Sequence, residues 1–371
     1  LMIILFACYA YECFSAFRSR ISTEKRNHIF DRQIFLMYLI HLDAFLVLYT
    51  VTDEINLIIL YFLQVILVTI VIVNYQLLYP KASRLVTNNM CMLLSVGFIM
   101  LCRLDIASAN KQLLIVACGS AVALVIPVMI RKMRFLRKLT WVYAGIGIVL
   151  LGAVFALART SYGAKLSLMG IQPSEVIKLT FVFFMASLLA REVTFKKVVL
   201  ATVVAGLHVG ILVLSRDLGS AVIFFAAYLV LIYVSTRKPA YLCIGIAGGT
   251  AGAVVAYHLF GHVRQRVSAW KDPMAVYQNE GYQIVQSLFA IGTGGWFGMG
   301  LCQGSPEKIP VVKNDFIFSA ICEELGGIFA ICLIFVCMSF FLTIVEIALQ
   351  IKNPFYKLIA IGLGAEYAFQ V

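Results

Sequence analysis

The hydrophobic positions of this chain form long, unbroken runs separated by polar loops. The runs lie near residues 1–14, 33–51, 55–78, 90–104, 112–130, 141–158, 175–190, 198–214, 219–235, 240–260, 317–349 and 357–371. Most approach the roughly 18 to 22 residues that a helix needs to cross about 30 Å of hydrocarbon. They lack the alternation typical of outer-membrane strands. Because backbone groups inside lipid must bond to one another, the pattern predicts an all-α fold, a polytopic bundle of transmembrane helices.

Lysine and arginine gather in every second loop. The basic residues are Arg18, Arg20, Lys25, Arg26 and Arg32, then Lys81 and Arg84, then Arg131, Lys132, Arg134, Arg137 and Lys138, then Arg191, Lys196 and Lys197, then Arg237 and Lys238, then Lys352 and Lys357. Such loops face the cytoplasm. The complementary loops then face outside, and the longest of them is 261–315. Loops of this length tend to be functional.

Composition supports a membrane protein and excludes other classes. The chain is 62% hydrophobic and 13% charged, whereas a soluble domain has about a quarter charged residues. Its net charge of +12 follows from the cytoplasmic loops, so we expect no nucleic-acid partner. No Cys or His spacing predicts a metal site. The chain opens and ends inside apolar stretches, which suggests that it continues beyond Leu1 and Val371.

Because the longest loop faces outside, we expect any chemistry on the outer side of the membrane. ATP and nucleotide sugars are lacking there, so a substrate must arrive already activated, such as on a lipid.

Pro173 and Ser174 are a plausible helix start. Glu175 and Lys178 follow at i and i+3 on one helix face. They are either a simple ion pair near the membrane interface or a pair that lines a cavity, because unpaired charges inside a membrane are costly.

The other outer segments also allow two interpretations. Asp217 could cap a helix, or it could belong to a site. In the long loop, basic residues (Arg264, Arg266) accompany Trp270, and the polar side chains of Tyr282, Gln283, Gln286 and Ser287 follow. The glycine-rich run 290–300 either is flexible or allows the backbone to approach a ligand closely. It is not a phosphate-binding P-loop, since it lacks the Gly-Lys-Ser/Thr ending.

Asp315 lies at the mouth of a long span, just after Lys313. A carboxylate there could simply stabilise the helix start, and it could equally act as a general base on a sugar hydroxyl. Glu323 and Glu324 are adjacent within the apolar helix that follows. Carboxylates at this depth must face protein or water, so we expect a role beyond simple structure for at least one of them.

In this order, the segments resemble the SEDS family (shape, elongation, division and sporulation proteins of the RodA and FtsW type). The resemblance covers roughly residues 88–371, and 1–87 would be additional N-terminal transmembrane helices and basic loops. The matching motifs are Gln172-Pro173-Ser174-Glu175 with Lys178, Asp217-Leu218-Gly219, Tyr282-Gln283 with Gln286-Ser287, Ala290-Ile291-Gly292 with Gly294-Gly295, Gly298 and Gly300, and Asp315-Phe316-Ile317-Phe318 leading to Glu323-Glu324-Leu325-Gly326.

The resemblance implies a core of ten helices that polymerises lipid II into glycan strands on the outer face of the bacterial cytoplasmic membrane, for cell-shape, division or sporulation wall synthesis. It also implies a class B penicillin-binding protein as partner. Asp315 matches the family's key carboxylate, which would deprotonate the acceptor's 4-hydroxyl. Undecaprenyl pyrophosphate would leave, and its charge calls for a divalent cation (Mg²⁺ or Mn²⁺) or for basic residues such as Arg264, Arg266 and Lys313. The remaining members of the expected substrate cavity are Glu175, Lys178, Asp217, Tyr282, Gln283, Gln286, Ser287, Glu323 and Glu324.

The chain departs from the family in several places. Ser215-Arg216 stands before Asp-Leu-Gly, Lys313-Asn314 replaces the customary His-Thr, and Met299 replaces a lysine. The family's last outer loop would follow Val371. Two alternatives from other functional classes stay open: a lipid II flippase or transporter, whose polar path would use the intramembrane charges, and a non-catalytic scaffold for a penicillin-binding protein.

Overall fold

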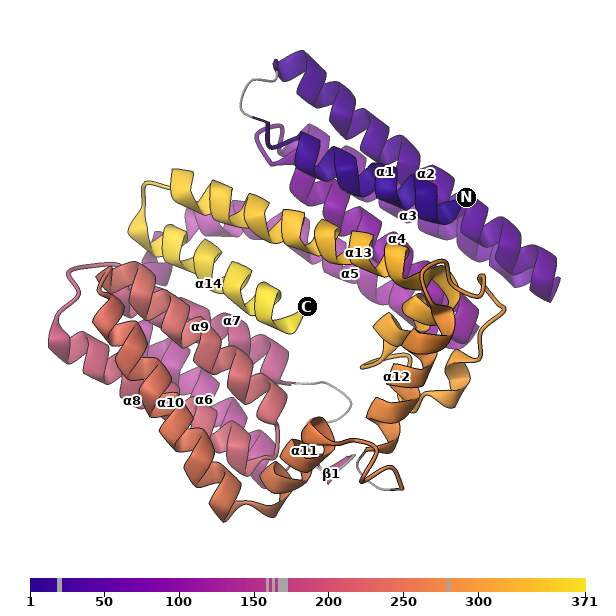
Figure 1. The fold of residues 1–371 in the computed structure, drawn as a ribbon. Helices are drawn as coiled ribbons and strands as arrows, with labels where there is room; N and C mark the ends of the chain where they lie inside the picture. Colours follow the sequence, from indigo (N-terminus) through magenta and orange to yellow (C-terminus); the bar gives the residue numbers. More distant parts are fainter. Residues whose placement is uncertain (19–21, 158–159, 162–163, 166–172, 279–280) are drawn as a thin grey trace. The chain divides into compact units, whose positions relative to one another are not determined.

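The computed structural model describes residues 1–18, 22–157, 160–161, 164–165, 173–278 and 281–371. The elements are α1 (Met2–Ser15), α2 (Thr23–Thr52), α3 (Ile55–Leu78), α4 (Arg84–Leu104), α5 (Ile106–Lys132), η1 (Arg134–Lys138), α6 (Thr140–Leu157), β1 (Thr160–Ser161), β2 (Ala164–Lys165), α7 (Pro173–Leu189), α8 (Phe195–Leu214), α9 (Leu218–Thr236), α10 (Pro239–Leu259), α11 (Gly261–Lys271), α12 (Tyr282–Gly294), η2 (Pro306–Lys308), α13 (Ile317–Gln350) and α14 (Pro354–Gln370) (Figure 1).

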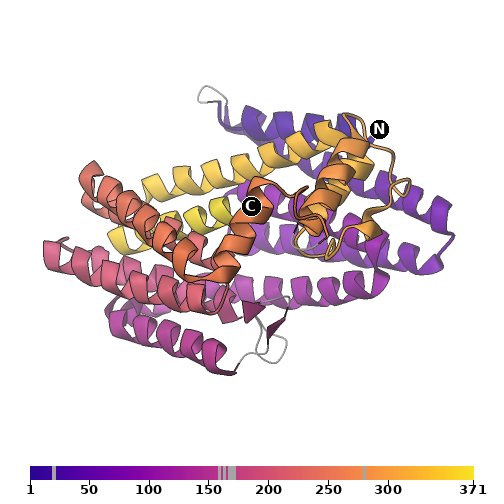
Figure 2. The same ribbon diagram turned by 60° about the horizontal axis from the view of Figure 1, so that its bottom comes forward.

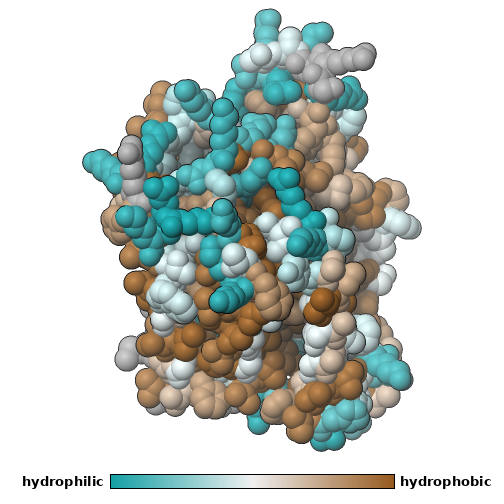
Figure 3. All heavy atoms as spheres, turned by 90° about the vertical axis from the view of Figure 1, so that its left-hand side faces the viewer, coloured by the Kyte–Doolittle hydropathy of each residue, from teal (hydrophilic) through white to brown (hydrophobic). Residues whose placement is uncertain are grey.

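Every hydrophobic run in the sequence corresponds to a helix, which confirms the all-α prediction. Among the described residues, nine helices are long and apolar enough to cross a membrane. Large hydrophobic side chains lie exposed on most of the helices, and Figure 3 shows many of them on one face, where the hydrophilic groups gather mainly in another part of the view. Such exposure suits a lipid environment, because a soluble monomer rarely shows large contiguous apolar patches.

Several helices begin earlier than predicted because polar residues extend them, and α2 is the clearest example. α2 begins at Thr23 rather than near 33, and Ser22 Oγ accepts a hydrogen bond from Lys25 N–H at 3.4 Å. Its 30 residues span about 45 Å, more than the hydrocarbon thickness. The first turns of α2 therefore extend into the aqueous phase. The outer segment 261–315, predicted as one long loop, contains the helices α11, α12 and η2.

The first of two compact units comprises 1–131 and 268–340. Here α2 packs against α1, α3 and α4, and Phe6 stacks on Phe329 with ring centroids 4.1 Å apart. The buried Asn89 side chain donates to Ser339 Oγ at 2.8 Å and accepts from the Tyr9 hydroxyl at 3.1 Å. The N-terminal helices thus share one core with α4 and α13. The predicted division into additional N-terminal helices (1–87) and a family-like core (88–371) rests on the resemblance and stays a prediction.

The second compact unit comprises 132–267 and 341–371. α7 packs against α6, α9 and α14, and α9 packs against α8 and α10. The side chains of Phe181, Phe184 and Phe224 are fully buried at the centre of this unit. Close packing of α14 needs glycine, because a Cβ at Gly362 would lie 2.7 Å from Val182 Cγ1.

Candidate active site

Asp315 lies two residues before the start of α13, and its side chain is exposed. Its backbone N–H donates to Val311 O at 3.2 Å, in a turn that leads into the helix. Among the described residues, no backbone N–H of α13 donates to its carboxylate, so it is not a hydrogen-bonded cap. Stabilisation of the helix start by its charge stays a prediction. The carboxylate is free to accept a proton or a hydrogen bond from a substrate.

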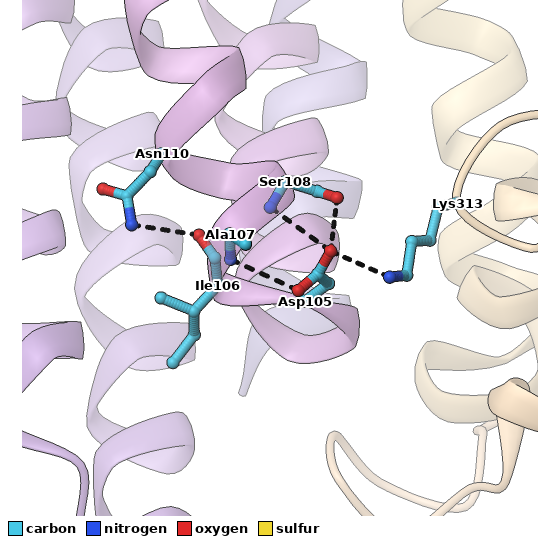
Figure 4. A network of polar contacts seen from close by, with 6 residues as sticks. All are labelled: Asp105, Ile106, Ala107, Ser108, Asn110 and Lys313. Atoms are coloured by element: carbon cyan, nitrogen blue, oxygen red, sulfur yellow. Dashed lines mark hydrogen bonds and ion pairs between the residues drawn. The ribbon is translucent and has the colours of Figure 1, made fainter.

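Lys313 connects the segment before α13 to the junction of α4 and α5. Its Nζ donates to Asp105 Oδ2 at 2.8 Å. The same carboxylate accepts from the backbone N–H groups of Ala107 at 3.2 Å and Ser108 at 3.3 Å (Figure 4). The hydrogen bond from Lys313, followed by that from Ser108, lowers the pKa of Asp105 to about 2. Asp105 is therefore an ionised anchor over the whole neutral range.

The helix α13 is interrupted at Gly326, whose φ of 88° and ψ of 166° are not helical. Glu323 O and Glu324 O, freed by the break, accept from Met299 N–H and Gly300 N–H, both at 2.9 Å. Beyond the break, Gly327 N–H donates to Gly295 O at 2.9 Å. The segment after α12 thus turns back over the start of α13 (Figures 1 and 2). Such a break is tolerated at membrane depth only where the freed backbone is satisfied by protein.

The hydrogen bonds between residues 295–300 and the break in α13 bear on the interpretation of the glycine-rich run 290–300. The interpretation as a flexible loop is wrong, since the run is hydrogen-bonded along the break in α13. The backbone of the run instead approaches α13 closely, since a Cβ at Gly294 would lie 2.0 Å from Cys322 O. Close approach to a ligand stays a prediction. The glycine-rich motif and the Glu323-Glu324-Leu325-Gly326 motif are therefore hydrogen-bonded to each other through their backbones.

Glu323 and Glu324 are both buried and both have protein partners. Glu323 Oε1 accepts from Ser305 N–H at 2.9 Å. Glu324 Oε1 pairs with Arg103 Nε at 2.9 Å, and its side chain is 0% exposed. Arg103 also donates to Gly304 O at 3.3 Å. These carboxylates stabilise the segment that precedes Asp315, and their predicted place in the substrate cavity stays a prediction.

The predicted polar residues of α12 lie in the same compact unit as Asp315. Ser287 Oγ and Ser319 Oγ are 2.5 Å apart, which connects α12 to the first turn of α13. Gln286 Nε2 donates to the Tyr277 hydroxyl at 3.1 Å. Gln283 is half-buried and Tyr282 is exposed.

Glu175 and Lys178 lie in the second compact unit, at the start of α7 as predicted. Lys178 Nζ donates to both carboxylate oxygens of Glu175, at 2.8 and 2.9 Å, and to Gln370 Oε1 at 2.8 Å. These residues line a cavity of about 460 Å³, together with Glu366. Glu366 is buried, and its Oε1 has no hydrogen-bond partner in the described chain. Glu175 and Lys178 therefore form an ion pair and also line a cavity, so the two interpretations do not exclude each other.

Gln172, the first residue of this motif, lies outside the described residues.

The other predicted residues of this unit are Asp217, Arg264 and Arg266. Asp217 is the N-cap of α9 and its Oδ1 accepts from Ser220 N–H at 3.1 Å, so the structural interpretation holds for it. Arg264 and Arg266 are exposed on α11. Burial and the charges of Arg216 and Arg266 lower the pKa of His262. The lowered pKa favours a neutral His262, so the positive charge at this end of α11 comes from its arginine side chains.

Three residues at these sites were not recognised in the sequence: Arg103, Asp105 and Glu366. Arg103 offered a signal, because a charge in the last turn of an apolar helix needs a partner. Glu366 is likewise a carboxylate within an apolar run. Asp105 resembles an ordinary loop residue, and only its contact with Lys313 distinguishes it.

Replacing Arg103 by methionine is expected to lower the free energy of unfolding by about 3 to 5 kcal/mol, because it leaves a buried carboxylate uncompensated. The melting temperature of the purified protein measures this loss, and adding Glu324→Gln should restore much of it. Arg84→Met is the matched control. It breaks an ion pair with Asp31, whose side chain is 61% exposed, and should cost at most about 1 kcal/mol. Equal melting temperatures for the two variants would contradict the prediction.

Comparisons with known proteins agree with this architecture. A sequence profile of the FtsW, RodA and SpoVE type, described as a cell cycle protein, matches residues 82–371. The peptidoglycan glycosyltransferase RodA of Mycobacterium bovis is 34% identical over 333 residues, covering 79% of this chain and 69% of that protein. The probable peptidoglycan glycosyltransferase FtsW of Aliivibrio salmonicida is 31% identical over 239 residues, covering 61% of this chain and 60% of that protein.

A solved structure shares the fold. It comes from work titled "Structural coordination of polymerization and crosslinking by a peptidoglycan synthase complex" and aligns with a TM-score of 0.52 and 21% identity over 84% of both chains. The sequence profile covers more than half of this chain, and the mycobacterial relative exceeds 30% identity. The chain therefore belongs to the FtsW, RodA and SpoVE family of cell cycle proteins.

Proposed function

We propose that this chain, a multi-pass peptidoglycan glycosyltransferase of the bacterial cytoplasmic membrane, polymerises lipid II at the outer face with Asp315 as general base. The observation that carries the role of Asp315 is its exposed carboxylate at the outer end of α13, without a side-chain partner in the described part of the chain. The flanking residues are held by ion pairs and hydrogen bonds. A free carboxylate on a rigid support suits proton transfer from a bound hydroxyl.

In the proposed reaction, Asp315 accepts the proton of the acceptor's 4-hydroxyl. The oxygen forms the new glycosidic bond at the anomeric carbon of the donor, and the bond from that carbon to the lipid diphosphate breaks. Undecaprenyl diphosphate leaves, and Asp315 returns its proton to water. Guanidinium groups bind phosphate oxygens, and Arg264 and Arg266 are exposed on α11, so both stay candidate cations for the diphosphate. Lys313, the third cation predicted for this role, is instead paired with Asp105.

A divalent cation remains part of the proposal. In the described ranges, no group of three or more His, Cys, Asp or Glu residues is arranged to hold a metal. Asp105 and Glu324 are already paired with Lys313 and Arg103. The described residues therefore offer no closed metal centre near Asp315. A bound Mg²⁺ would take most of its oxygens from the donor diphosphate and water, as is common for this ion.

A partner transpeptidase is also proposed. The solved relative belongs to a peptidoglycan synthase complex that, by its title, couples polymerisation and crosslinking. A class B penicillin-binding protein would supply the crosslinking activity. The flippase alternative needs polar groups free along a path, and Glu323 and Glu324 are instead bound by Ser305 and Arg103.

Purified protein supplied with fluorescent lipid II and Mg²⁺ is expected to produce a ladder of glycan polymers on a gel. Chelation with EDTA should reduce the product, because the leaving diphosphate loses charge neutralisation. Vesicles containing the same labelled lipid provide the counter-test. Lipid movement across the bilayer without any polymer would identify a transporter and contradict the proposal.

A further inference from the structure

We propose that Asp105 is a positioning residue for glycosyl transfer, which fixes the segment that presents Asp315 through its ion pair with Lys313. The inference rests on the proposed function of Asp315 and extends it to a residue on a distant part of the chain. Asp105 and Lys313 are 208 residues apart in sequence, and their side-chain atoms lie 2.8 Å apart.

Asp105 is well suited to serve as a fixed support. It ends α4, and its two carboxylate oxygens accept the free N–H groups at the start of α5, from Ala107 and Ser108 (Figure 4). Helix starts favour a negative charge, because their N–H groups lack partners within the helix. The backbone at the junction of α4 and α5 thus holds the Asp105 carboxylate in one orientation. Lys313 Nζ donates to this fixed carboxylate.

The segment before α13 depends on such a support. Residues 309–316 contain no helix or strand, and Val311 has a φ of 58°, which is unfavourable for a β-branched residue. A conformation of this kind persists only when its surroundings impose it. The side chains of Ile309 and Val312 are buried. Within the described ranges, the ion pair of Lys313 is the only polar side-chain contact of residues 310–316.

The outer end of α4 holds the neighbouring part of the same segment as well. Arg103, two residues before Asp105, contacts Gly304 O and Glu324. The first turn of α13 is held from the other side, where Ser319 meets Ser287. Loss of the contact between Asp105 and Lys313 would release the part nearest to Asp315 and leave the other two contacts in place.

Asp105 is itself a poor candidate for the base. Lys313 and Ser108 hold its pKa at about 2, so it has little tendency to accept a proton at neutral pH. Because the folded-state pKa is lowered, the contribution of the ion pair is complete above the ordinary carboxyl range of about 4 and is lost as pH falls through about 2. The effect of removing the pair should therefore be constant from about pH 6 to pH 8.

The test compares Asp105→Asn, Lys313→Gln and the double variant in the lipid II assay. Asparagine keeps an oxygen for the start of α5 but loses the charge. We expect kcat to fall at least about tenfold, with KM nearly unchanged, since small displacements of a catalytic group are costly. The double variant should be no worse than the poorer single variant, and Lys313→Arg should recover most of the loss. Lys111→Gln, which removes an exposed cation from the start of α5, is the control and should leave kcat unchanged.

Three outcomes would overturn the proposal. If Asp105→Asn lowered kcat by the same factor in the wild-type protein and in the Lys313→Gln protein, the two residues would act independently. Asp105 would then serve only as a helix cap. A raised KM with unchanged kcat would assign Lys313 to substrate binding. Unchanged hydrogen exchange of peptides covering 305–318 would show that the pair does not fix the segment. The exchange measurement is independent of catalysis, so it tests Asp105 even if Asp315→Asn were to remain active and the proposed function failed.

Discussion

Replacing Asp315 by asparagine is expected to reduce lipid II polymerisation by about 100-fold or more, the range that a general base commonly contributes. Asparagine has nearly the same shape, so the segment before α13 should keep its structure. What disappears is the group that accepts the acceptor's proton. The measurement is the initial rate of glycan formation by purified protein at saturating lipid II, with the melting temperature recorded for the same preparation.

Glu307→Gln provides the matched control for that experiment. Glu307 is an exposed carboxylate in η2, within the same outer segment. Its neutralisation removes one negative charge from the surface without touching the proposed base, so the rate should stay close to wild type. A fully active Asp315→Asn protein would remove the proposed base. An equal loss in both variants would point to a general effect of surface charge.

The second large effect is expected from Gly298→Ala, which should lower the free energy of unfolding by about 3 kcal/mol or more. Gly298 has a φ of 74°, which disfavours any residue with a side chain. Its added Cβ would also lie 2.3 Å from Glu324 O and 2.6 Å from Gly326 N. Those atoms are backbone and cannot rotate away, so the junction between the glycine run and the break in α13 must open. The melting temperature and the polymerisation rate should fall together.

Gly292→Ala is the control for this prediction. Gly292 lies in α12, and an added Cβ meets nothing within 4 Å. Alanine favours the helix by about 1 kcal/mol relative to glycine, so the melting temperature should be unchanged or slightly higher. If Gly298→Ala were as stable as Gly292→Ala, the close contact with α13 would not be a structural requirement.

The sequence predicted the helices well because their cause is local. A helix inside lipid must be long enough and apolar enough to cross the bilayer, and both properties can be read from consecutive residues. The pairing of Glu175 with Lys178 was equally accessible, since i and i+3 positions share a helix face. Asp315 was a candidate from its place at the start of a span, but only the ordered motifs of the family resemblance favoured the role of a base over that of a residue that stabilises the helix start.

The tertiary structure alone decided how the site is held together. Arg103 and Glu324 are 221 residues apart, and no periodicity connects such positions. The break at Gly326 was not predicted either, although Glu323, Glu324 and the pair Gly326-Gly327 interrupt the apolar run 317–349 at this point. Its cause is the approach of the glycine run, which replaces the hydrogen bonds that a straight helix would make within itself. The sequence by itself therefore determined the membrane-spanning helices and the candidate residues, because burial in lipid acts on each segment separately. Only the packing of distant segments decided that Asp105, Glu323 and Glu324 are bound by protein, while Asp315 has no side-chain partner among the described residues.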